Sequence, residues 1–214
     1  MKAAMKNILI VDDHEVLRDG VKRIFDKQSG TVNFGEASTV PEALRLVRLR
    51  DWDVVVLDIS LGQRSGLEML KELKQIRPRL PVLILSMHSE ELFARRAFKA
   101  GASGYITKDS PRAELVNAVN KVMSGGRYVS EAVAEKLAFD LGMGARDATH
   151  ESLSDREFEV LRLIASGKTV SQVGSILSLS ESTISTYRAR ILEKMGMKTN
   201  AELTHYAIQN KLVD

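Results

Sequence analysis

The sequence predicts two domains of different class: an α/β domain with a five-stranded, doubly wound parallel sheet, and a smaller all-α domain of four helices. The first prediction depends on five short apolar runs that alternate with amphipathic stretches, which is typical of β–α units joined by right-handed crossovers. The second depends on the region after residue 150, where helical patterns follow one another and no strand pattern occurs.

Three of the five predicted strands of the first domain are continuous runs of valine, isoleucine and leucine, as expected for parallel strands covered by helices on both faces. The five strands lie at 7–11, 32–37, 53–58, 81–86 and 104–108. The predicted helices lie at 14–27, 41–50, 65–76, 90–100 and 111–124. Ser65 and Glu68 fit a capping box at the start of the third of these helices.

Glycines and a change of pattern mark the boundary between the domains. The predicted segments are the first domain at 1–125, a partly helical linker at 126–150 and the second domain at 151–214. The pair Gly125-Gly126 ends the last helix of the first domain, and 130–141 fits a helix within the linker.

The second domain shows its helix starts through capping boxes, in which a serine or threonine is followed three residues later by glutamate or glutamine. The three pairs are Ser154 with Glu157, Thr169 with Gln172, and Thr199 with Glu202. A fourth helix is predicted over 181–195, after Ser180. The helix at 169–178, the short turn that follows and the helix at 181–195 together predict a helix-turn-helix.

Composition excludes several classes of protein. The chain has 214 residues, of which 44% are hydrophobic, so it can form packed cores. It has no cysteine, which excludes disulfides and thiolate metal sites, and its four histidines are scattered without an HExxH pattern, which argues against a zinc site. The first apolar run is too short for a signal peptide or a membrane span, so we expect a cytoplasmic protein.

Charged and hydroxyl side chains gather at one edge of the predicted sheet. Asp12 and Asp13 follow the first strand, and Asp58 ends the third. Ser86 ends the fourth strand, and Lys108 follows the fifth. Ligands of doubly wound sheets bind beyond these carboxyl ends. Crowded carboxylates repel each other unless a cation neutralises them, and Mg²⁺ prefers such oxygen ligands. An aspartate can also attack phosphorus, so the cluster predicts Mg²⁺-dependent phosphoryl transfer to a carboxylate.

Five stretches of the first domain resemble the receiver domain of two-component response regulators. They are IVDDH (10–14), VVLDIS (55–60), SGLEML (65–70), LSMHSEE (85–91) and GASGYITKDS (101–110). The resemblance covers about the first 125 residues and implies a flavodoxin-like fold. It also implies that Asp58 accepts a phosphoryl group from a sensor histidine kinase. Asp12, Asp13 and Asp58, with the main-chain carbonyl of Ser60, are then the ligands of Mg²⁺.

The same resemblance assigns a switch. Ser86 and Tyr105 match the family's switch hydroxyl and switch aromatic residue, and Lys108 matches its phosphate-binding lysine. On phosphorylation the hydroxyl moves to the phosphate and the aromatic ring turns inward, which changes the surface of the domain. The loop after the phosphoacceptor usually reads Met-Pro-Gly in the family, whereas here it reads Leu61-Gly62-Gln63. Its length is kept, and we expect an effect on phosphorylation rate rather than on the chemistry.

The second domain resembles the LuxR-type helix-turn-helix over nearly its whole length, 153–211, beginning with LSDREFEVLRLIASGKT at Leu153. A receiver followed by this module defines the NarL/FixJ class. On the second helix of the motif, Ile184, Tyr187, Ile191 and Met195 form an apolar stripe that is expected to pack inward. The residues predicted to contact DNA lie on the other face and its flanks: Ser182, Ser185, Thr186, Arg188, Ala189, Arg190, Lys194 and Lys198.

Charge supports a DNA contact only locally. Four basic residues against one glutamate give a net charge of +3 over 186–198, whereas the whole chain also carries only +3. Short side chains at Ser185 and Ala189 can make few base contacts, so we expect specificity to depend partly on DNA shape. The predicted partners are a sensor histidine kinase, double-stranded promoter DNA, a second copy of the phosphorylated chain and RNA polymerase. We expect the unphosphorylated receiver to occlude the recognition helix at least in part.

Two other functions remain open from the residues alone. The acidic cluster could belong to an enzyme, an aspartyl-phosphate phosphatase, but such an enzyme calls for a second acid two residues after the nucleophile, where this chain has Ser60. Alternatively, the receiver could act as a phosphate-independent dimerisation or ligand-binding module. The leading prediction is a DNA-binding regulator that is no enzyme beyond slow loss of its own phosphate.

Overall fold

A computed structural model describes residues 5–26, 32–62, 64–88, 90–131, 133–135 and 149–213 of the chain. The chain divides into two units, Met1–Phe139 and Asp140–Asp214. Gln63 of the predicted phosphoacceptor loop and residues 136–148, with most of the predicted linker helix, lie outside the described residues.

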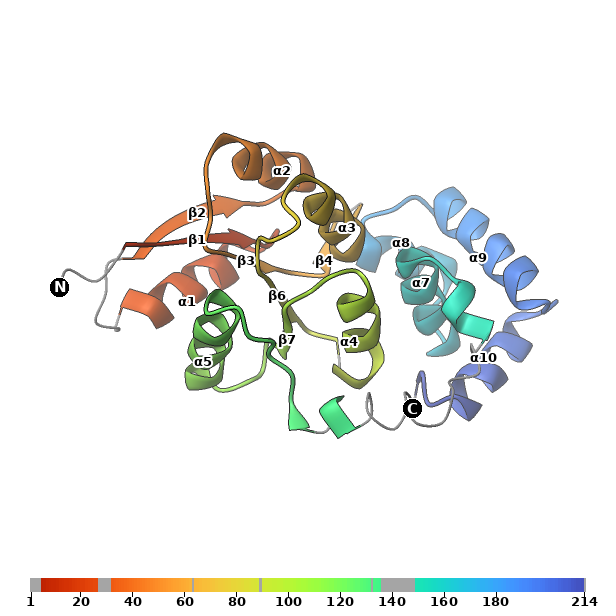
Figure 1. Cartoon of the computed structure of the whole chain (residues 1–214). Coiled ribbons are helices and arrows are strands. Elements are labelled where there is room, and N and C mark those ends of the chain that lie inside the picture. The colour runs from red at the N-terminus through yellow and green to blue at the C-terminus, as the bar shows by residue number, and fades with distance from the viewer. Residues whose placement is uncertain are drawn as a thin grey trace. The chain divides into compact units, whose positions relative to one another are not determined.

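The first unit is built on a parallel sheet of five strands in the order β2-β1-β3-β6-β7 (Figure 1). The strands are β1 (Lys6–Val11), β2 (Val32–Ala37), β3 (Val54–Leu57), β6 (Val82–Ser86) and β7 (Gly104–Thr107). Every residue of β3 and β6 is buried, which explains their continuous apolar sequences. The predicted five-stranded, doubly wound parallel sheet is confirmed.

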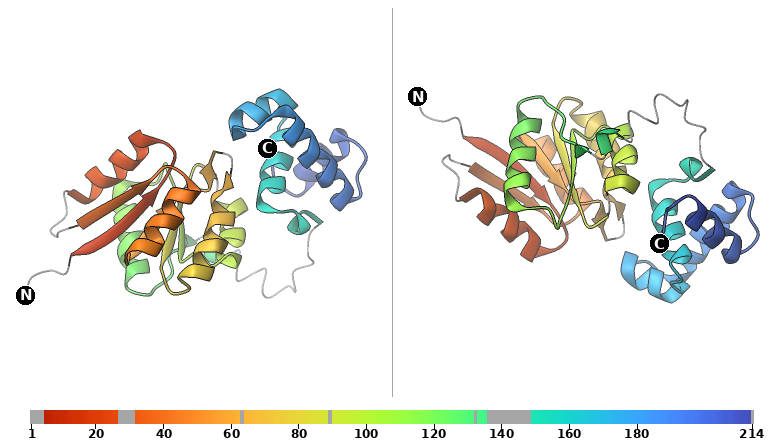
Figure 2. Two further views of the ribbon diagram at one scale, coloured as in Figure 1. Left: turned by 90° about the horizontal axis from the view of Figure 1, so that it is seen from above. Right: turned by 90° about the horizontal axis from the view of Figure 1, so that it is seen from below.

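Five helices cover the two faces of this sheet. They are α1 (Glu15–Asp26), α2 (Val40–Leu49), α3 (Gly66–Ile76), α4 (Glu90–Lys99) and α5 (Arg112–Met123). Figure 2 shows the sheet from opposite sides, with α2 and α3 in front from above and α5 in front from below. One core lies between the sheet and the helices α1 and α5, where Val21 and Phe25 meet Leu115 and Val119.

The loop after β3 forms a small hairpin that the sequence did not predict. Strands β4 (Ser60–Leu61) and β5 (Arg64–Ser65) pair antiparallel. Gly62 has a φ of +51°, a left-handed conformation that glycine adopts at little cost. Ser65 caps α3, but its hydroxyl accepts the N–H of Leu67, so the predicted pairing with Glu68 is not the bond that forms.

A short segment after α5 lies along the open edge of β7. The N–H of Tyr128 donates to the carbonyl of Ser103, and the N–H of Tyr105 donates to the carbonyl of Tyr128. The hydroxyl of Tyr128 donates to Glu114 on α5 over 2.8 Å. A Cβ at Gly104 would lie 2.9 Å from the Cβ of Tyr128, so this approach requires glycine. We call residues 127–131 the edge segment.

Over its described residues, 149–213, the second unit forms helices and no strands, as predicted. A 3₁₀ turn at Thr149–Ser152 is followed by α7 (Asp155–Ala165), α8 (Val170–Leu177), α9 (Glu181–Met195) and α10 (Asn200–Gln209). The capping boxes at Ser154 and Thr169 are confirmed. Thr199 caps α10, whereas the carboxylate of Glu202 accepts the N–H of Lys198. Among the described residues, no helix is both long and apolar enough to cross a membrane.

Gly174 allows the close approach of chain segments within the helix-turn-helix. We expect Gly174→Ala to lower the stability of the second unit by about 1–2 kcal/mol, although alanine is the better helix former by about 1 kcal/mol. The added Cβ would lie 2.7 Å from the carbonyl oxygen of Leu179, and backbone cannot move aside cheaply. Urea unfolding followed by circular dichroism measures the change. Ser175→Ala on the exposed side of α8 is the matched control, and stabilisation by Gly174→Ala would contradict the steric argument.

Candidate functional site

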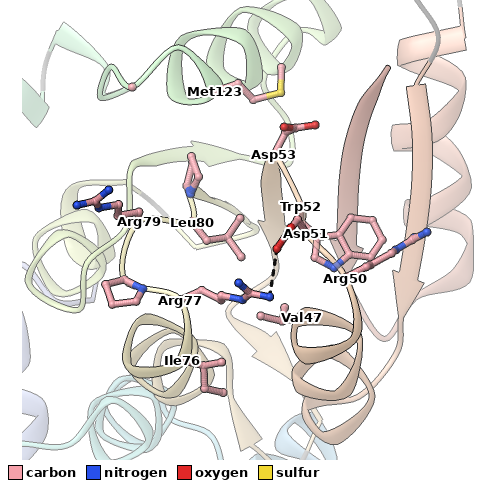
Figure 3. A pocket seen from close by; sticks show the side chains of 13 residues that line it. Val47, Arg50, Asp51, Trp52, Asp53, Ile76, Arg77, Arg79, Leu80 and Met123 are labelled. Carbon is pink, nitrogen blue, oxygen red and sulfur yellow. Dashed lines mark ion pairs between the residues drawn. The ribbon is translucent and has the colours of Figure 1, made fainter. Parts of the chain in front are cut away.

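The amino-terminal edge of the sheet carries a hollow of about 720 Å³, lined by residues that include Trp52, Arg77 and Leu80 (Figure 3). Four of its charged groups have partners within the fold. Arg77 pairs with Asp51 over 3.1 Å, and Asp53 accepts the N–H of Asn7 over 2.7 Å. The guanidinium of Arg50 lies 3.8 Å from the centroid of the Trp52 ring. The chemistry predicted from sequence lies at the opposite edge.

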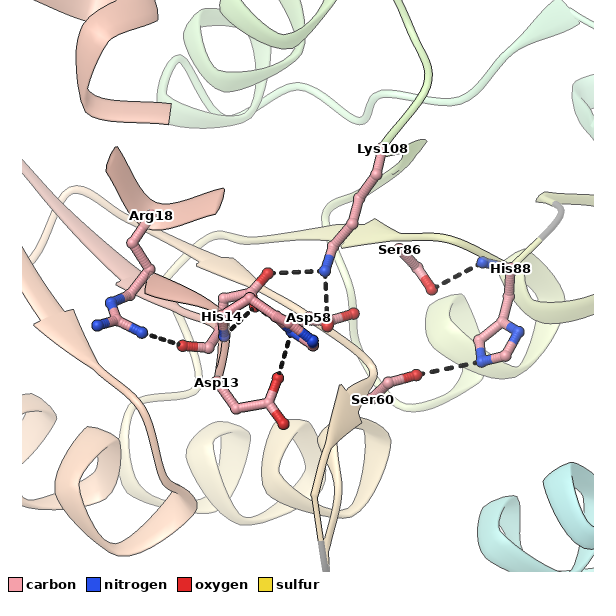
Figure 4. A network of polar contacts seen from close by, with 9 residues as sticks. Asp13, His14, Arg18, Asp58, Ser60, Ser86, His88 and Lys108 are labelled. Atoms are coloured by element: carbon pink, nitrogen blue, oxygen red, sulfur yellow. Dashed lines mark hydrogen bonds and ion pairs between the residues drawn. The ribbon is translucent and has the colours of Figure 1, made fainter. Parts of the chain in front are cut away.

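At the carboxyl-terminal edge of the sheet, Lys108 contacts the carboxylates of both Asp12 and Asp58; Figure 4 shows Lys108 directed at Asp58. The ammonium of Lys108 lies 2.7 Å from a carboxylate oxygen of Asp12 and 2.7 Å from one of Asp58. All three side chains are at most 5% exposed. The sheet fixes them, because Asp58 donates its N–H to the carbonyl of Val11 and Lys108 donates its own to that of Ser86.

The second aspartate of the pair and a histidine complete the cluster. Asp13 is one-third exposed, and the Nδ1 atom of His14 lies 2.8 Å from its carboxylate. Ligand atoms of Asp12, Asp13, His14 and Asp58 all lie within 4.8 Å of one another. The Oδ1 atom of Asp58 is buried and has no hydrogen-bond partner among the described residues. A divalent cation would satisfy this oxygen and neutralise the carboxylates, so the donor set fits such an ion.

Burial and charge act in opposite directions on this cluster. Burial raises the pKa of Asp58 to about 6, because it outweighs the nearby charge of Lys108, and the charge of Asp12 adds to the rise. Burial alone would lower the pKa of Lys108, but its ion pairs with Asp58 and Asp12 raise that pKa above the usual value. Lys108 thus stays charged because two carboxylates stabilise its ammonium. Asp58 is stabilised less, because the same ammonium also pairs with Asp12.

The raised pKa of Asp58 predicts a pH-dependent stability difference in metal-free protein. Because the folded-state pKa of about 6 exceeds the ordinary value of 3.8, the native state binds the proton more tightly than the unfolded state does. The destabilising contribution of Asp58 is therefore complete at neutral pH, where the side chain is ionised, and absent in acid, where it is protonated in both states. We expect Asp58→Asn to be more stable than wild type by about 2–3 kcal/mol near pH 7, and this advantage to vanish as the pH falls through about 6 towards 4.

Urea unfolding in EDTA over a series of pH values measures this difference. Trp52 is the chain's one tryptophan and lies in the first unit, so its fluorescence follows that unit alone. A difference that stays constant with pH would contradict the prediction.

Both predicted switch residues form a hydrogen bond with His88, in the loop after β6. Tyr105 is fully buried, and its hydroxyl donates to the carbonyl of His88 over 3.0 Å. The hydroxyl of Ser86 accepts the N–H of His88 over 3.1 Å. The ring of His88 stacks on Phe93 and lies 3.2 Å from the hydroxyl of Ser60. His88 thus connects Ser60, in the loop after Asp58, to Ser86 and Tyr105, the two predicted switch residues.

Sequence reasoning missed His14 and His88. Neither stands in a histidine motif, and both act through rings whose positions depend on loops from different strands. The only sequence signal was their place: His14 directly follows the Asp12-Asp13 pair, and His88 stands two residues after Ser86. Residues next to the carboxyl ends of strands in a doubly wound sheet lie close to its ligand site.

On α9 the predicted apolar stripe is buried or partly buried and the opposite face is exposed, as expected. Ile184, Ile191 and Met195 are buried, and Tyr187 is partly buried. The predicted contact residues that lie exposed are Ser182, Ser185, Thr186, Ala189, Arg190, Lys194 and Lys198. Arg188 is partly buried and donates to Asn200 over 2.6 Å.

One of the basic groups on this face already has a partner within the unit. The ammonium of Lys194 lies 2.7 Å from the carboxylate of Glu157, which also closes the capping box of α7. Burial acts to raise the pKa of Glu157, but the contact with Lys194 and the hydrogen bonds with Ser154 together lower this pKa below its usual value. Lys194 therefore holds α9 against α7, and a phosphate contact would have to share it.

Comparison with known families identifies the class. The model of the response regulator receiver domain matches residues 8–120, more than half of the chain, and that of the bacterial regulatory proteins of the luxR family matches residues 151–207. The chain belongs to the response regulator family: it is a two-component response regulator with a receiver domain and a LuxR-type DNA-binding domain. The predicted resemblance to the NarL/FixJ class is confirmed, and this family controls transcription rather than acting as an enzyme.

Two related response regulators match nearly the whole chain. It is 33% identical over 209 residues to the response regulator UvrY of Escherichia coli K12, with 97% of this chain and 96% of UvrY covered. It is 34% identical over 211 residues to the response regulator GacA of Pseudomonas aeruginosa, with 98% and 99% covered. A solved LuxR-family two-component response regulator from Aurantimonas is 38% identical, with a TM-score of 0.59, and covers 64% of this chain and 98% of its own.

Proposed function

We propose that Asp58 accepts a phosphoryl group from a sensor histidine kinase in a Mg²⁺-dependent reaction, and that this modification promotes dimerisation and binding to promoter DNA. The observation that carries the proposal is the buried contact of Asp58 with Lys108, together with the unpaired Oδ1 of Asp58 beside two further carboxylates. This arrangement holds one carboxylate at a place where a cation and an ammonium can neutralise an incoming phosphoryl group.

The chemistry follows from these groups. A carboxylate oxygen of Asp58 attacks the phosphorus of a phosphohistidine; the new P–O bond forms as the P–N bond breaks, and its electron pair stays on the departing imidazole. Lys108 can bind a phosphoryl oxygen, and Ser86, which accepts the N–H of His88, can donate its own hydrogen to another. Asp12, Asp13, Asp58 and the main-chain carbonyl of Ser60 would hold Mg²⁺, which supplies charge neutralisation and orientation when bound.

The output of the proposed function depends on the second unit. The exposed face of α9 offers Ser182, Ser185 and Arg190 to a major groove, with Lys198 at its end for phosphates. A dimer would read two half-sites, and RNA polymerase is the proposed further partner at a promoter. We infer a cytoplasmic protein that hydrolyses its own aspartyl phosphate slowly at most. The turn at Leu61-Gly62 is expected to affect the rate of phosphorylation.

Incubation with acetyl phosphate and Mg²⁺, followed by intact mass measurement and DNA binding to a selected site, tests this function. We expect one phosphoryl group on wild type and none on Asp58→Ala, with tighter DNA binding in the modified sample only. Asp51→Ala is the matched control, because Asp51 is a 91% exposed aspartate at the other edge of the sheet. No phosphoryl group on wild type, with DNA binding unchanged, would favour a phosphate-independent receiver.

A further inference from the structure

The ring of His14 lies against the acidic cluster, at the place where the proposed function puts a cation (Figure 4). Its Nδ1 atom is 2.8 Å from a carboxylate oxygen of Asp13 and 3.2 Å from one of Asp12. The backbone N–H of His14 donates to that same oxygen of Asp12 over 2.8 Å, which fixes the residue beside the pair. The sequence alone argued against a zinc site because no two histidines share a motif. A site that combines carboxylates with imidazole, however, needs only one histidine.

A second observation indicates that the cluster binds a ligand: one of its buried oxygens lacks a hydrogen-bond partner among the described residues. Asp58 is 3% exposed, and its Oδ1 atom has no hydrogen-bond partner in the described part of the chain. Asp58 and His14 both belong to the group of four residues whose ligand atoms lie within 4.8 Å of one another. An ion bound by Asp58 and Asp13 would therefore have an imidazole nitrogen within reach.

The freedom of the ring makes a direct bond feasible. The side chain of His14 is 65% exposed and touches the carboxylates of Asp12 and Asp13. A bond of about 2.0–2.1 Å from Nδ1 to a metal needs only a small rotation of such a side chain. No buried packing has to be broken, because Nδ1 already lies 2.8 Å from a carboxylate oxygen of Asp13 at the exposed rim of the cluster.

The ligand atom that His14 adds, an imidazole nitrogen, determines which metal ions the site binds more tightly. Carboxylate, carbonyl and water oxygens suit Mg²⁺, whereas imidazole nitrogen suits zinc and other late first-row divalent ions. We propose that His14 is a direct ligand of a late first-row divalent cation, with Zn²⁺ as its representative, in competition with Mg²⁺ for Asp13 and Asp58. This inference rests on the proposed function, because it uses the same carboxylates.

The competing explanation is that His14 only forms an ion pair with Asp13 and takes no part in metal binding. That role would leave the affinities for Zn²⁺ and Mg²⁺ equally affected, or equally unaffected, by removal of the ring. A direct ligand has a different signature. Its loss weakens Zn²⁺ selectively, and its Nδ1 resonance changes when Zn²⁺ is added but not when Mg²⁺ is added.

Calorimetric titration of the full-length, unphosphorylated protein with ZnCl₂ and with MgCl₂ tests the proposal. We expect His14→Ala to bind Zn²⁺ at least about tenfold more weakly than wild type, while its Mg²⁺ affinity stays within about twofold. His205→Ala is the matched control, because His205 is an exposed histidine on α10 of the other unit. Nitrogen-15 NMR of the histidine rings should show a Zn²⁺-dependent change at Nδ1 of His14.

The outcomes separate the two claims. Normal Mg²⁺ binding together with equal Zn²⁺ affinity in wild type and His14→Ala would overturn the role of His14 and leave the phosphoacceptor site standing. Absence of Mg²⁺ binding to wild type, or Mg²⁺ binding that survives Asp13→Asn unchanged, would overturn the proposed metal site and this inference with it. Selective loss of Zn²⁺ binding in His14→Ala, with the NMR change, supports a direct ligand.

Discussion

Replacement of Lys108 by methionine should destabilise the metal-free first unit by about 3–5 kcal/mol at neutral pH, the usual cost of removing one partner from a buried ion pair. Methionine fills a similar volume, so the change removes the charge and little packing. It leaves the carboxylates of Asp12 and Asp58, each at most 5% exposed, without the ammonium that holds both at 2.7 Å. Urea unfolding followed by Trp52 fluorescence gives the loss.

The cause of that loss can be checked by two rescues. Millimolar Mg²⁺ should restore part of the stability, because a cation would replace the missing charge. Acid should reduce the gap to wild type, because protonation removes the repulsion between the carboxylates. Lys74→Met is the matched control: Lys74 is a partly buried lysine that donates to the carbonyl of Leu80 and should cost only about 1 kcal/mol. Equal losses for the two variants would contradict the electrostatic explanation.

Gly66→Ala should be the most damaging single-methyl change near the site. A Cβ at Gly66 would collide with the carbonyl oxygen of Asp58 and lie 2.8 Å from the Cα of Ile59. These are backbone atoms, held by the bond from the N–H of Gly66 to the carbonyl of Ile59 over 2.7 Å. We expect a loss of about 3 kcal/mol or more in the stability of the first unit.

The same substitution should also slow phosphorylation, because the strand end that carries Asp58 has to shift to admit the methyl group. Trp52 fluorescence in urea and intact mass after acetyl phosphate treatment measure the two effects. Gly20→Ala is the matched control, since a Cβ there meets nothing within 4 Å on an exposed turn of α1, and it should stabilise the unit slightly. A variant with normal stability would show that the α3 start can move freely.

The sequence predicted the elements whose side chains repeat with a clear period. The buried strands β3 and β6 and the capped helices α7 and α8 were predicted because local pattern and tertiary environment agree there. The hairpin of β4 and β5 was missed because strands of two residues carry no period. Its formation depends on the turn at Gly62 and on α3 beginning immediately afterwards.

The residues of the candidate site also fall into those that the sequence could place and those that it could not. Asp12, Asp58 and Lys108 could be placed together because strand order brings their strand ends to one edge. The ring contacts of His14 and His88 could not, because they depend on side-chain rotation within loops. The same holds for the ion pair between Lys194 and Glu157, whose partners come from helices far apart in the sequence.

The edge segment has a consequence for how two receivers can meet. Its Tyr128 occupies backbone groups of β7 that a strand from another molecule would otherwise pair with. At the opposite border of the sheet, Glu36 of β2 is paired with Arg18 and Lys22, which places charge beside that strand. Continuation of the sheet from one copy into the next is therefore disfavoured at both borders, so a dimer of this receiver is expected to form through helix surfaces. A receiver cut directly after Gly125 would lose this protection of β7 and should self-associate through it.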